Sequence, residues 1–388
     1  MTRKSFFSLI LFLVCFHTAS AIKIISGPYL QNVTDTEVTI IWRTDADALS
    51  WVELAPDGSD SFYATAHPRY YAADMGRAVI GRLHKVTIRK LQPNTTYRYR
   101  ILSSEVLVEE PYYVGYGRTT ATDVYGREAL RFTTTGPADD SLEFLMVNDI
   151  HGDNKKFEEL MAGFRKGETD FVLFNGDMVS FMDNENQLFE GFLNKAVDMF
   201  ASETPFIMVR GNHESRGKFA QKYMNYFPTP TGKPYYALQR GPVYFIFLDG
   251  GEDKPDNCME YYGTAFGDDY RAEQAEWLEQ VVASEEFRKA PYHIVVCHVP
   301  PVGDTWHGPA HSKALWLPIL NKAGIDIMLC GHLHQHEFHE KGFEGAQFPV
   351  LVNSNKDVVK VKADSLALRL DISNRKGEAV GKPLVIKQ

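Results

Sequence analysis

The chain has few cysteines and no excess of positive charge, and each absence limits what it can be. It has 4 cysteines in 388 residues and a formal net charge of −9 at pH 7. So few cysteines argue against a small fold held together by disulfide bonds, and Cys297 and Cys330 lie in apolar runs typical of buried thiols. A negative net charge disfavours clamping of a nucleic-acid backbone, which requires clustered Lys and Arg side chains. No repeat period suggests a solenoid, and the length predicts two domains.

The first apolar run, Phe6–Phe16, is too short to cross a lipid bilayer, which needs about 20 residues. Two basic residues precede it and small residues at 19–21 follow it, which is the pattern of an export signal. We therefore expect residues 1–21 to be a cleaved signal peptide, and the mature protein to be periplasmic or extracellular without a transmembrane anchor. Lipid anchoring of Cys15 is disfavoured because bulky residues flank it.

Residues 22–136 have the pattern of an all-β domain. Val38–Trp42 is rich in β-branched and aromatic residues, whereas Lys85–Arg89 and Tyr97–Ile101 alternate apolar with polar side chains, as strands with one buried face do. Between the last two, the segment Leu91-Gln-Pro-Asn-Thr-Thr-Tyr97 suits a tight corner capped by a tyrosine hydroxyl in an immunoglobulin-like sandwich. This pattern resembles fibronectin type III modules, and most of all the module that precedes the catalytic domain of purple acid phosphatases.

Residues 137–388 change to short apolar runs that alternate with polar, helix-like segments, which indicates a layered α/β domain. The predicted strands are Leu142–Val147, Phe171–Phe174, Phe206–Val209, Val243–Leu248, His293–Cys297 and Ile325–Cys330, with further strand-like alternation at Asp357–Ile372. The predicted helices are Lys155–Lys166, Asn186–Phe200, Ala272–Phe287 and Ser312–Asn321. We expect the two domains to join at Gly136-Pro137.

Five of the six apolar runs end directly in residues that can bind metal ions. These clusters are Asn148-Asp149-Ile-His151, Asn175-Gly-Asp177, Arg210-Gly-Asn-His-Glu214, His298 and Gly331-His-Leu-His334. Side chains just past the carboxyl ends of strands converge on one edge of a layered α/β fold, so we expect one pocket. Any single cluster is more often structural, but all five in one order favour a metal centre. Three oxygen donors and four imidazoles are too many for one tetrahedral zinc site and suit two ions that share a carboxylate.

The same motifs resemble the full motif set of calcineurin-like metallophosphoesterases. The resemblance implies two β-sheets packed together between helices, and two metal ions per chain, for which we expect Fe, Mn or Zn. It implies that one metal is held by Asp149, His151, Asp177 and His334, and the other by Asp177, Asn212, His298 and His332, with Asp177 as the bridge. It further implies that His213 contacts the phosphate and assists the leaving group, and that Glu214 orients His213.

Three positions depart from purple acid phosphatases. The tyrosine that those enzymes carry three residues after the bridging Asp is Ser180 here, and their glycine at the end of the first motif is His151. After the last histidine they show Tyr-Glu-Arg, where this chain has His336-Glu-Phe338. The missing tyrosine predicts a centre without their ferric, coloured site, and leaves the identity of both metals open.

Three residues have weaker indications of substrate binding. His307 and His311 follow His298 on a loop and either could donate a hydrogen bond to phosphate, the alternative being a solvated loop histidine. Arg210 could offer a cation to phosphate or form a structural salt bridge. The polar segment Gly250–Asp269 is predicted as a lid or as a surface loop.

The expected function is that of an exported metal-dependent phosphohydrolase, which cleaves small-molecule phosphate monoesters through attack by a metal-activated water or hydroxide. A phosphodiesterase acting on nucleotides or phospholipid headgroups is the alternative, because the same metals serve both reactions. A binding protein on a phosphatase scaffold is disfavoured, because all seven ligands are present.

Overall fold

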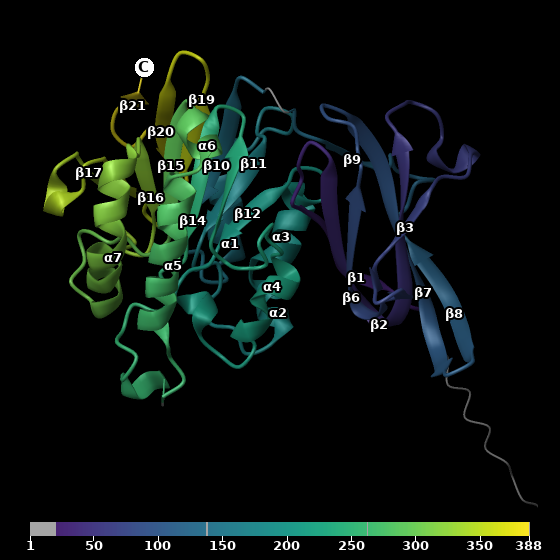
Figure 1. Ribbon diagram of the computed structural model, residues 1–388. Coiled ribbons are helices and arrows are strands. Elements are labelled where there is room, and N and C mark those ends of the chain that lie inside the picture. The colour runs from purple at the N-terminus through teal and green to yellow at the C-terminus, as the bar shows by residue number, and fades with distance from the viewer. Residues whose placement is uncertain (1–20, 137–138, 262, 388) are drawn as a thin grey trace, which may run out of the picture.

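The chain forms two β-rich units in series (Figure 1). The computed structural model describes residues 21–136, 139–261 and 263–387, so the predicted signal peptide lies outside the described residues except for Ala21. In the first unit the strands are β1 (Ile24–Gln31), β2 (Glu37–Pro56), β3 (Arg69–Tyr71), β4 (Ala73–Asp74), β5 (Arg77–Ala78), β6 (Ile80–Arg89), β7 (Thr96–Glu110), β8 (Tyr113–Ala121) and β9 (Leu130–Thr133).

The second unit contains twelve strands and seven α-helices among its described residues. Its strands are β10 (Leu142–Val147), β11 (Phe171–Asn175), β12 (Phe206–Val209), β13 (Tyr236–Arg240), β14 (Val243–Leu248), β15 (Tyr292–Cys297), β16 (Ile327–Cys330), β17 (Glu337–His339), β18 (Val350–Val352), β19 (Asp357–Ala363), β20 (Leu368–Asn374) and β21 (Leu384–Lys387). Its helices are α1 (Asn154–Leu160), α2 (Glu185–Leu188), α3 (Asn194–Ala196), α4 (Tyr223–Tyr226), α5 (Gly267–Val282), α6 (Glu285–Lys289) and α7 (His307–Ala323). Within the described ranges, no helix has the length and apolar character needed to cross a membrane.

The first unit is all-β, as predicted, and its strands enclose an apolar core that includes Trp42. β2 is 20 residues long, far longer than the predicted Val38–Trp42, because it pairs in two stretches. Its first half lies antiparallel to β1 and β6 and its second half antiparallel to β3 and β7, with a register shift between Arg43 and Ala48. The predicted tyrosine corner is present, since the Tyr97 hydroxyl accepts a hydrogen bond from the Gln92 N–H at 2.9 Å.

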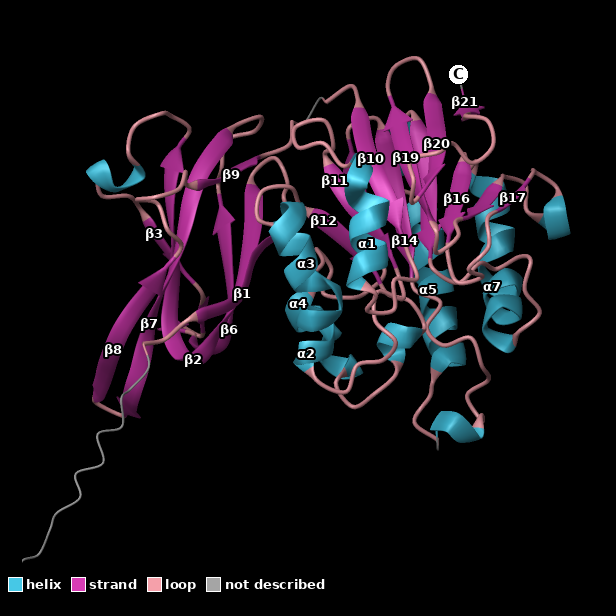
Figure 2. Ribbon diagram, turned by 180° about the vertical axis from the view of Figure 1, so that it is seen from behind, coloured by secondary structure: helices cyan, strands magenta, loops and turns pink. Residues whose placement is uncertain are grey.

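The second unit consists of two six-stranded sheets with helices on their outer faces, in agreement with the predicted α/β layers (Figure 2). One sheet has the order β12-β11-β10-β19-β20-β21 and the other β13-β14-β15-β16-β18-β17. Apolar side chains from both sheets, such as Phe144, Phe245 and Leu329, form a shared core between them. A second core packs β10, β11 and β12 against α1–α4, and a third packs β14, β15 and β16 against α5 and α7. Strands buried on both faces explain the continuous apolar runs in the sequence.

The helices differ from the predicted ones mainly at their ends. The predicted helix at 272–287 is two helices, because Ser284 is extended and its side chain accepts a hydrogen bond from the Phe287 N–H, which caps α6. The predicted helix at 186–200 contains two π-helical turns, Phe189–Leu193 and Val197–Ala201. α7 begins at His307, five residues before its predicted start.

The two units share a junction with buried hydrogen bonds. Tyr29 of β1 is fully buried among the helices behind β11 and β12, where its ring stacks on Phe206 and its hydroxyl donates to the Tyr226 carbonyl at 3.0 Å. The hydroxyl of Tyr99, also buried, donates to the Ser202 carbonyl at 2.6 Å. The first unit therefore completes part of the core of the second.

Candidate metal centre

Five strands end at one edge of the sheet sandwich, and each is followed by candidate metal ligands. β10, β11 and β12 are parallel neighbours in one sheet, and β15 and β16 are parallel neighbours in the other. The carboxyl ends of such strands meet at the edge where α/β folds bind their ligands. The structure brings together there all seven predicted ligands: Asp149, His151, Asp177, Asn212, His298, His332 and His334.

The backbone of this edge is strained. Five of the seven residues have positive φ values: Asp149 (+54°), His151 (+52°), Asp177 (+53°), His332 (+71°) and His334 (+58°). A left-handed conformation costs a non-glycine residue roughly 1–2 kcal/mol, and such strain is concentrated at functional sites. The turns after the strands therefore hold these side chains in place at a cost in stability.

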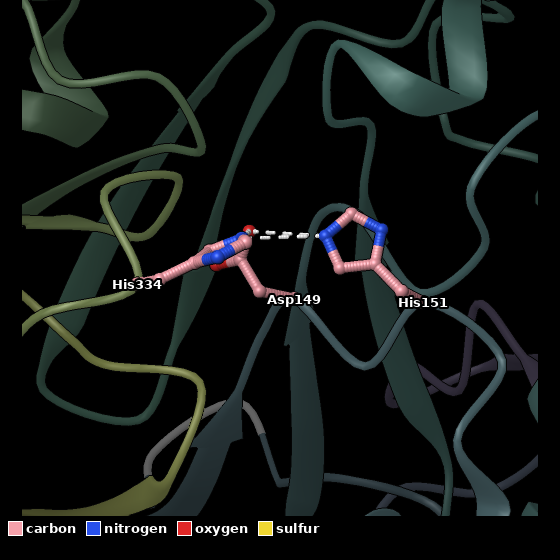
Figure 3. A group of neighbouring side chains, drawn as sticks. All are labelled: Asp149, His151 and His334. Atoms are coloured by element: carbon pink, nitrogen blue, oxygen red, sulfur yellow. Dashed lines mark hydrogen bonds and ion pairs between the residues drawn. The ribbon is translucent and has the colours of Figure 1, made fainter.

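Asp149, His151 and His334 form one group with metal-ligand spacing (Figure 3). The His334 Nε2 atom lies 3.1 Å from Asp149 Oδ1 and 3.3 Å from His151 Nε2. Asp149 is fully buried, whereas the two imidazoles reach the surface. Asp177 borders this group, with its Oδ2 atom 3.9 Å from His151 Nε2.

Asp177, His298 and His332 form a second such group. The same Asp177 Oδ2 atom lies 3.1 Å from His298 Nε2, so this carboxylate stands between the two groups. One end of the Asn212 amide lies 3.3 Å from Asp177 Oδ2 and 3.2 Å from His332 Nδ1. With its oxygen at that end, the amide adds a third lone pair to those of the carboxylate and the imidazole, which is a donor set for a metal cation.

The surroundings of His298 show whether a metal ion fits among these residues. Its Nδ1–H donates to the Asn175 carbonyl at 2.6 Å, while its buried Nε2 has no hydrogen-bond partner among the described residues and faces Asp177 and Asp149 at 3.1 and 3.8 Å. Burial opposes a charge on this ring, but the two carboxylates outweigh burial and raise the pKa of His298 to about 10. A metal ion between ring and carboxylates would take the place of that proton, so these residues fit the expected metal pair.

Two other imidazoles are held in the neutral form. Burial lowers the pKa of His151 and of His332 to about 4, despite the carboxylates nearby. The pKa of His334 is instead raised by its hydrogen bond to Asp149. A neutral imidazole offers the free lone pair that metal binding requires.

Glu214 makes contacts other than those predicted for it. The sequence predicts that it orients His213, but its fully buried carboxylate accepts hydrogen bonds from the main-chain N–H groups of Asp177 and Gly211, both at 2.9 Å, and of Val179 at 3.2 Å. Burial, followed by the charge of Asp177, raises the pKa of Glu214 to about 7. Glu214 thus joins the loop after β11 to the loop after β12 and positions Asp177 through its backbone.

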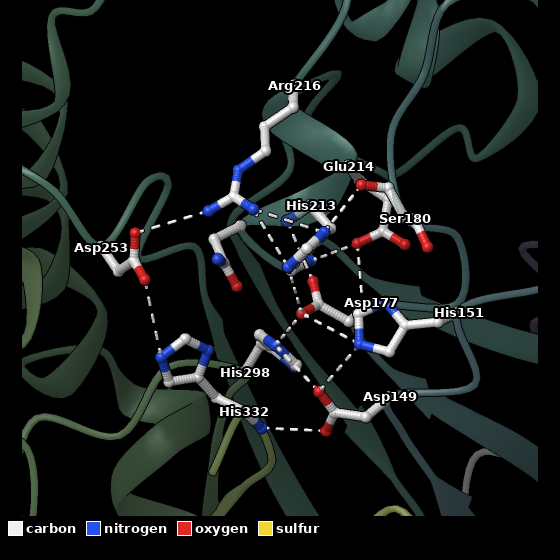
Figure 4. A network of polar contacts seen from close by, with 12 residues as sticks. Asp149, His151, Asp177, Ser180, His213, Glu214, Arg216, Asp253, His298 and His332 are labelled. Carbon is white, nitrogen blue, oxygen red and sulfur yellow. Dashed lines mark hydrogen bonds and ion pairs between the residues drawn. The ribbon is translucent and has the colours of Figure 1, made fainter. Parts of the chain in front are cut away.

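His213 faces the centre from a 3₁₀ turn, His213–Ser215 (Figure 4). Its Nδ1–H donates to the Ser180 carbonyl at 2.7 Å, which orients the ring, and its Nε2 lies 3.8 Å from Asp177 Oδ2. Arg216 follows the same turn and places Nη1 3.0 Å from His213 Nε2. Sequence reasoning missed Arg216, although residues three apart in such a turn lie on one face.

The other predicted substrate contacts are paired with carboxylates outside the seven ligands. Arg210 Nε donates to the buried Asp249 at 2.8 Å. His307 Nε2 and His311 Nδ1 lie 2.8 and 3.3 Å from Asp268 Oδ1, on the first residues of α5. No described contact joins these three residues to the ligands. The ion pairs of His307 and His311 instead join α7 to α5, and that of Arg210 joins the loop after β12 to the loop after β14.

Other polar side chains fix the ligands from outside. Asn148 Nδ2 donates to Asp149 Oδ2 at 2.6 Å, and His332 Nε2 lies 3.6 and 3.9 Å from the carboxylates of Asp304 and Asp253. Ligating imidazoles commonly face a carboxylate on their far side, which fixes their orientation. Asp253 and Asp304 come from loops on the second sheet, so their approach to His332 follows from the tertiary fold.

A hollow of about 300 Å³ opens beside His151. Ser180, Phe181, Gln187 and Glu190 also line it, and its described lining contains no Lys or Arg. Phe181 is 47% exposed there. This volume lies at the lower end of the range for small-molecule sites.

Comparison with known proteins gives matches over both units. Residues 142–336 match the calcineurin-like phosphoesterase family, and residues 27–116 match the purple acid phosphatase N-terminal domain. Acid phosphatase type 7 of Mus musculus is 26% identical over 321 residues, which cover 77% of this chain and 67% of that protein. Purple acid phosphatase 22 of Arabidopsis thaliana is 24% identical over 285 residues, which cover 69% of this chain and 56% of that protein. The chain therefore spans between about half and two thirds of the length of these relatives.

Proposed function

The chain belongs to the calcineurin-like phosphoesterase family, whose members are metal-dependent phosphohydrolases, and we propose that it hydrolyses phosphate monoesters of small organic molecules. One observation carries this proposal: seven donor side chains from five strand ends lie close enough together to hold metal ions, with Asp177 between the two groups. Relatives named as acid phosphatases support monoesters over diesters.

Two metal ions fit the donor set, and their identity remains among Fe, Mn and Zn. We assign Asp149, His151, Asp177 and His334 to one ion and Asp177, Asn212, His298 and His332 to the other. When bound, such a pair supplies Lewis acidity and lowers the pKa of water. The chain contributes the rest: Glu214 fixes Asp177 by its backbone, and Asn148 fixes Asp149.

His213 is placed to contact the phosphate of the substrate. Its ring is oriented by the Ser180 carbonyl, and its Nε2 faces the centre 3.8 Å from Asp177 Oδ2. The ester's organic group would occupy the hollow beside His151. Because that wall has an acidic residue, Glu190, and no cationic one, we expect neutral or cationic leaving groups to be preferred over polyanionic ones.

The domain boundaries are part of the proposal. We propose an export signal at residues 1–21, a fibronectin type III-like domain at 22–136 and the catalytic domain at 137–388. Export to the periplasm or the extracellular space follows from the signal. The junction at Tyr29 and Tyr99 indicates that the first domain supports the catalytic domain mechanically.

The test combines metal analysis with Asp177→Asn. We expect two metal equivalents in the purified protein and turnover of phenyl phosphate and alkyl phosphates. Asp177→Asn should remove at least one equivalent and most activity, because the amide loses the charge shared by two ions. Full metal content and full activity in this variant would refute the two-metal proposal, and turnover of diesters alone would favour the phosphodiesterase alternative.

A further inference from the structure

Arg216 stands at the metal centre without a role in the proposal above. Its Nε and Nη2 groups donate to the two carboxylate oxygens of Glu252, at 2.8 and 2.7 Å, and Nη2 lies 3.5 Å from Asp253 Oδ1. This two-point ion pair fixes the plane of the guanidinium. Glu252 lies 36 residues away, in the loop after β14, so that loop holds Arg216 over the strand ends.

Arg216 also contacts His213, whose ring is oriented by a separate hydrogen bond. His213 Nδ1 carries its proton toward the Ser180 carbonyl, because a carbonyl oxygen only accepts. Arg216 Nη1 lies 3.0 Å from His213 Nε2 and 3.4 Å from Nδ1, so the guanidinium lies over the face of the imidazole ring. The guanidinium therefore lies beside the His213 ring at the centre and adds charged N–H donors there.

One of these N–H groups is available. Nη1 carries two hydrogens, and among the described residues its one polar side-chain neighbour is His213. The Arg216 side chain is 25% exposed, so a small anion can reach it, and its charge does not depend on pH in the working range. A guanidinium fixed by a carboxylate pair has little entropy to lose when it binds an oxyanion.

We propose that Arg216 binds a terminal oxygen of the ester phosphate and selects dianionic monoesters over monoanionic diesters. The inference rests on the proposed function and names the residue that sets its substrate class. A monoester carries three terminal oxygens and two negative charges, whereas a diester has lost one of each. A charge-assisted N–H···O bond to a fixed guanidinium therefore favours the monoester.

The experiment compares Arg216→Met with wild type in the metal-loaded protein. The measurements are kcat/KM for phenyl phosphate and for methyl phenyl phosphate, and calorimetric binding of inorganic phosphate. We expect kcat/KM for the monoester to fall roughly 10- to 100-fold, and that for the diester about threefold or less. Phosphate should bind at least about tenfold more weakly, with metal content unchanged.

Arg69→Met is the matched control. Arg69 also donates to a buried glutamate, Glu53, at 3.1 Å, but in the first unit. It should leave the monoester-to-diester ratio and phosphate binding unchanged. If Arg216→Met perturbs folding, Arg216→Lys is the second variant. It keeps the positive charge but loses the planar guanidinium with its two parallel donors, and it should still weaken phosphate binding about threefold or more.

Two outcomes would overturn the inference. Equal losses on the two esters would make Arg216 a structural clamp for the loop that carries Glu252. Unchanged phosphate affinity in both Arg216 variants would exclude contact with the anion. Failure of the proposed function looks different, because wild type itself would then lack turnover, while the phosphate titration would still report on Arg216.

Discussion

Gly176 lies between β11 and Asp177, and its replacement by alanine should break the metal centre while leaving the fold. Gly176 has φ +82°, and an added Cβ would lie 2.4 Å from both Cγ and Nδ1 of His298. Gly167 has almost the same φ, +84°, but there an added Cβ would meet no described heavy atom within 4 Å. The two substitutions therefore share the backbone strain and differ in the contact with a ligand.

The magnitudes follow from this geometry. The left-handed conformation costs alanine roughly 1–2 kcal/mol at either site. Non-bonded atoms settle at about 3.5–4.0 Å, so at Gly176 the imidazole of His298 or the backbone of Asp177 must move by about 1 Å. Metal sites tolerate changes of only about 0.2 Å in ligand distance. Whichever side moves, one ligand is displaced, and overpacking adds about 1–3 kcal/mol.

Metal analysis and denaturant unfolding of the two variants measure these effects separately. Gly167→Ala should lose about 1–2 kcal/mol of unfolding free energy and retain both metals and activity. Gly176→Ala should lose more stability, at least one metal equivalent and most activity. A Gly176→Ala protein with both metals and wild-type kcat would contradict the assignment of His298 and Asp177 as ligands.

Three further predictions test other parts of the molecule. If His213 protonates the leaving group, His213→Asn should slow alkyl phosphate hydrolysis more than nitrophenyl phosphate hydrolysis. Such general-acid catalysis typically contributes ~10²- to 10⁴-fold in rate. An equal loss in kcat/KM across a series of leaving groups would mean that His213 only binds phosphate or supports Arg216. Iron-loaded protein should show no tyrosinate-to-iron absorption band, because Ser180 occupies the tyrosine position, and a visible band that is lost on replacing a nearby tyrosine would disprove this. Burial lowers the pKa of His84 to about 4, although the charge of Asp47 acts to raise it. Below about pH 6.5 the unfolded chain therefore binds a proton at this residue that the folded chain does not bind. Unfolding free energy should therefore fall by about 2–3 kcal/mol as the pH drops from about 6.5 to 4, and His84→Gln should flatten that part of the measured pH curve.

The strands and the candidate ligands were predictable because both depend on local sequence. A strand buried on both faces must be apolar throughout, so β10, β12 and β14 agree with their predicted bounds. The ligands follow those strands directly, and the parallel arrangement brings them to one edge. Glycine and strained turns then decide the exact direction of each side chain, which a sequence pattern does not contain.

What the sequence could not predict depends on contacts between distant segments. Arg216 is fixed by Glu252, and the orientation of His332 depends on Asp253 and Asp304. Arg210 resembles a phosphate ligand by its place in the motif, but the fold supplies Asp249 as its partner. In each case the deciding carboxylate lies on a loop whose position only the tertiary structure sets.

The burial of Tyr29 determines how the chain can be divided. Its ring fills a socket lined by Phe206 and neighbouring apolar residues of the second unit, so the second unit lacks part of its core when separated. A chain that began at residue 137 would expose that socket to water, and exposed apolar surface of this kind promotes aggregation. The intact chain should accordingly unfold in one calorimetric transition. The β-domain could be exchanged for another only if the replacement also supplied an apolar side chain to fill the site that Tyr29 occupies.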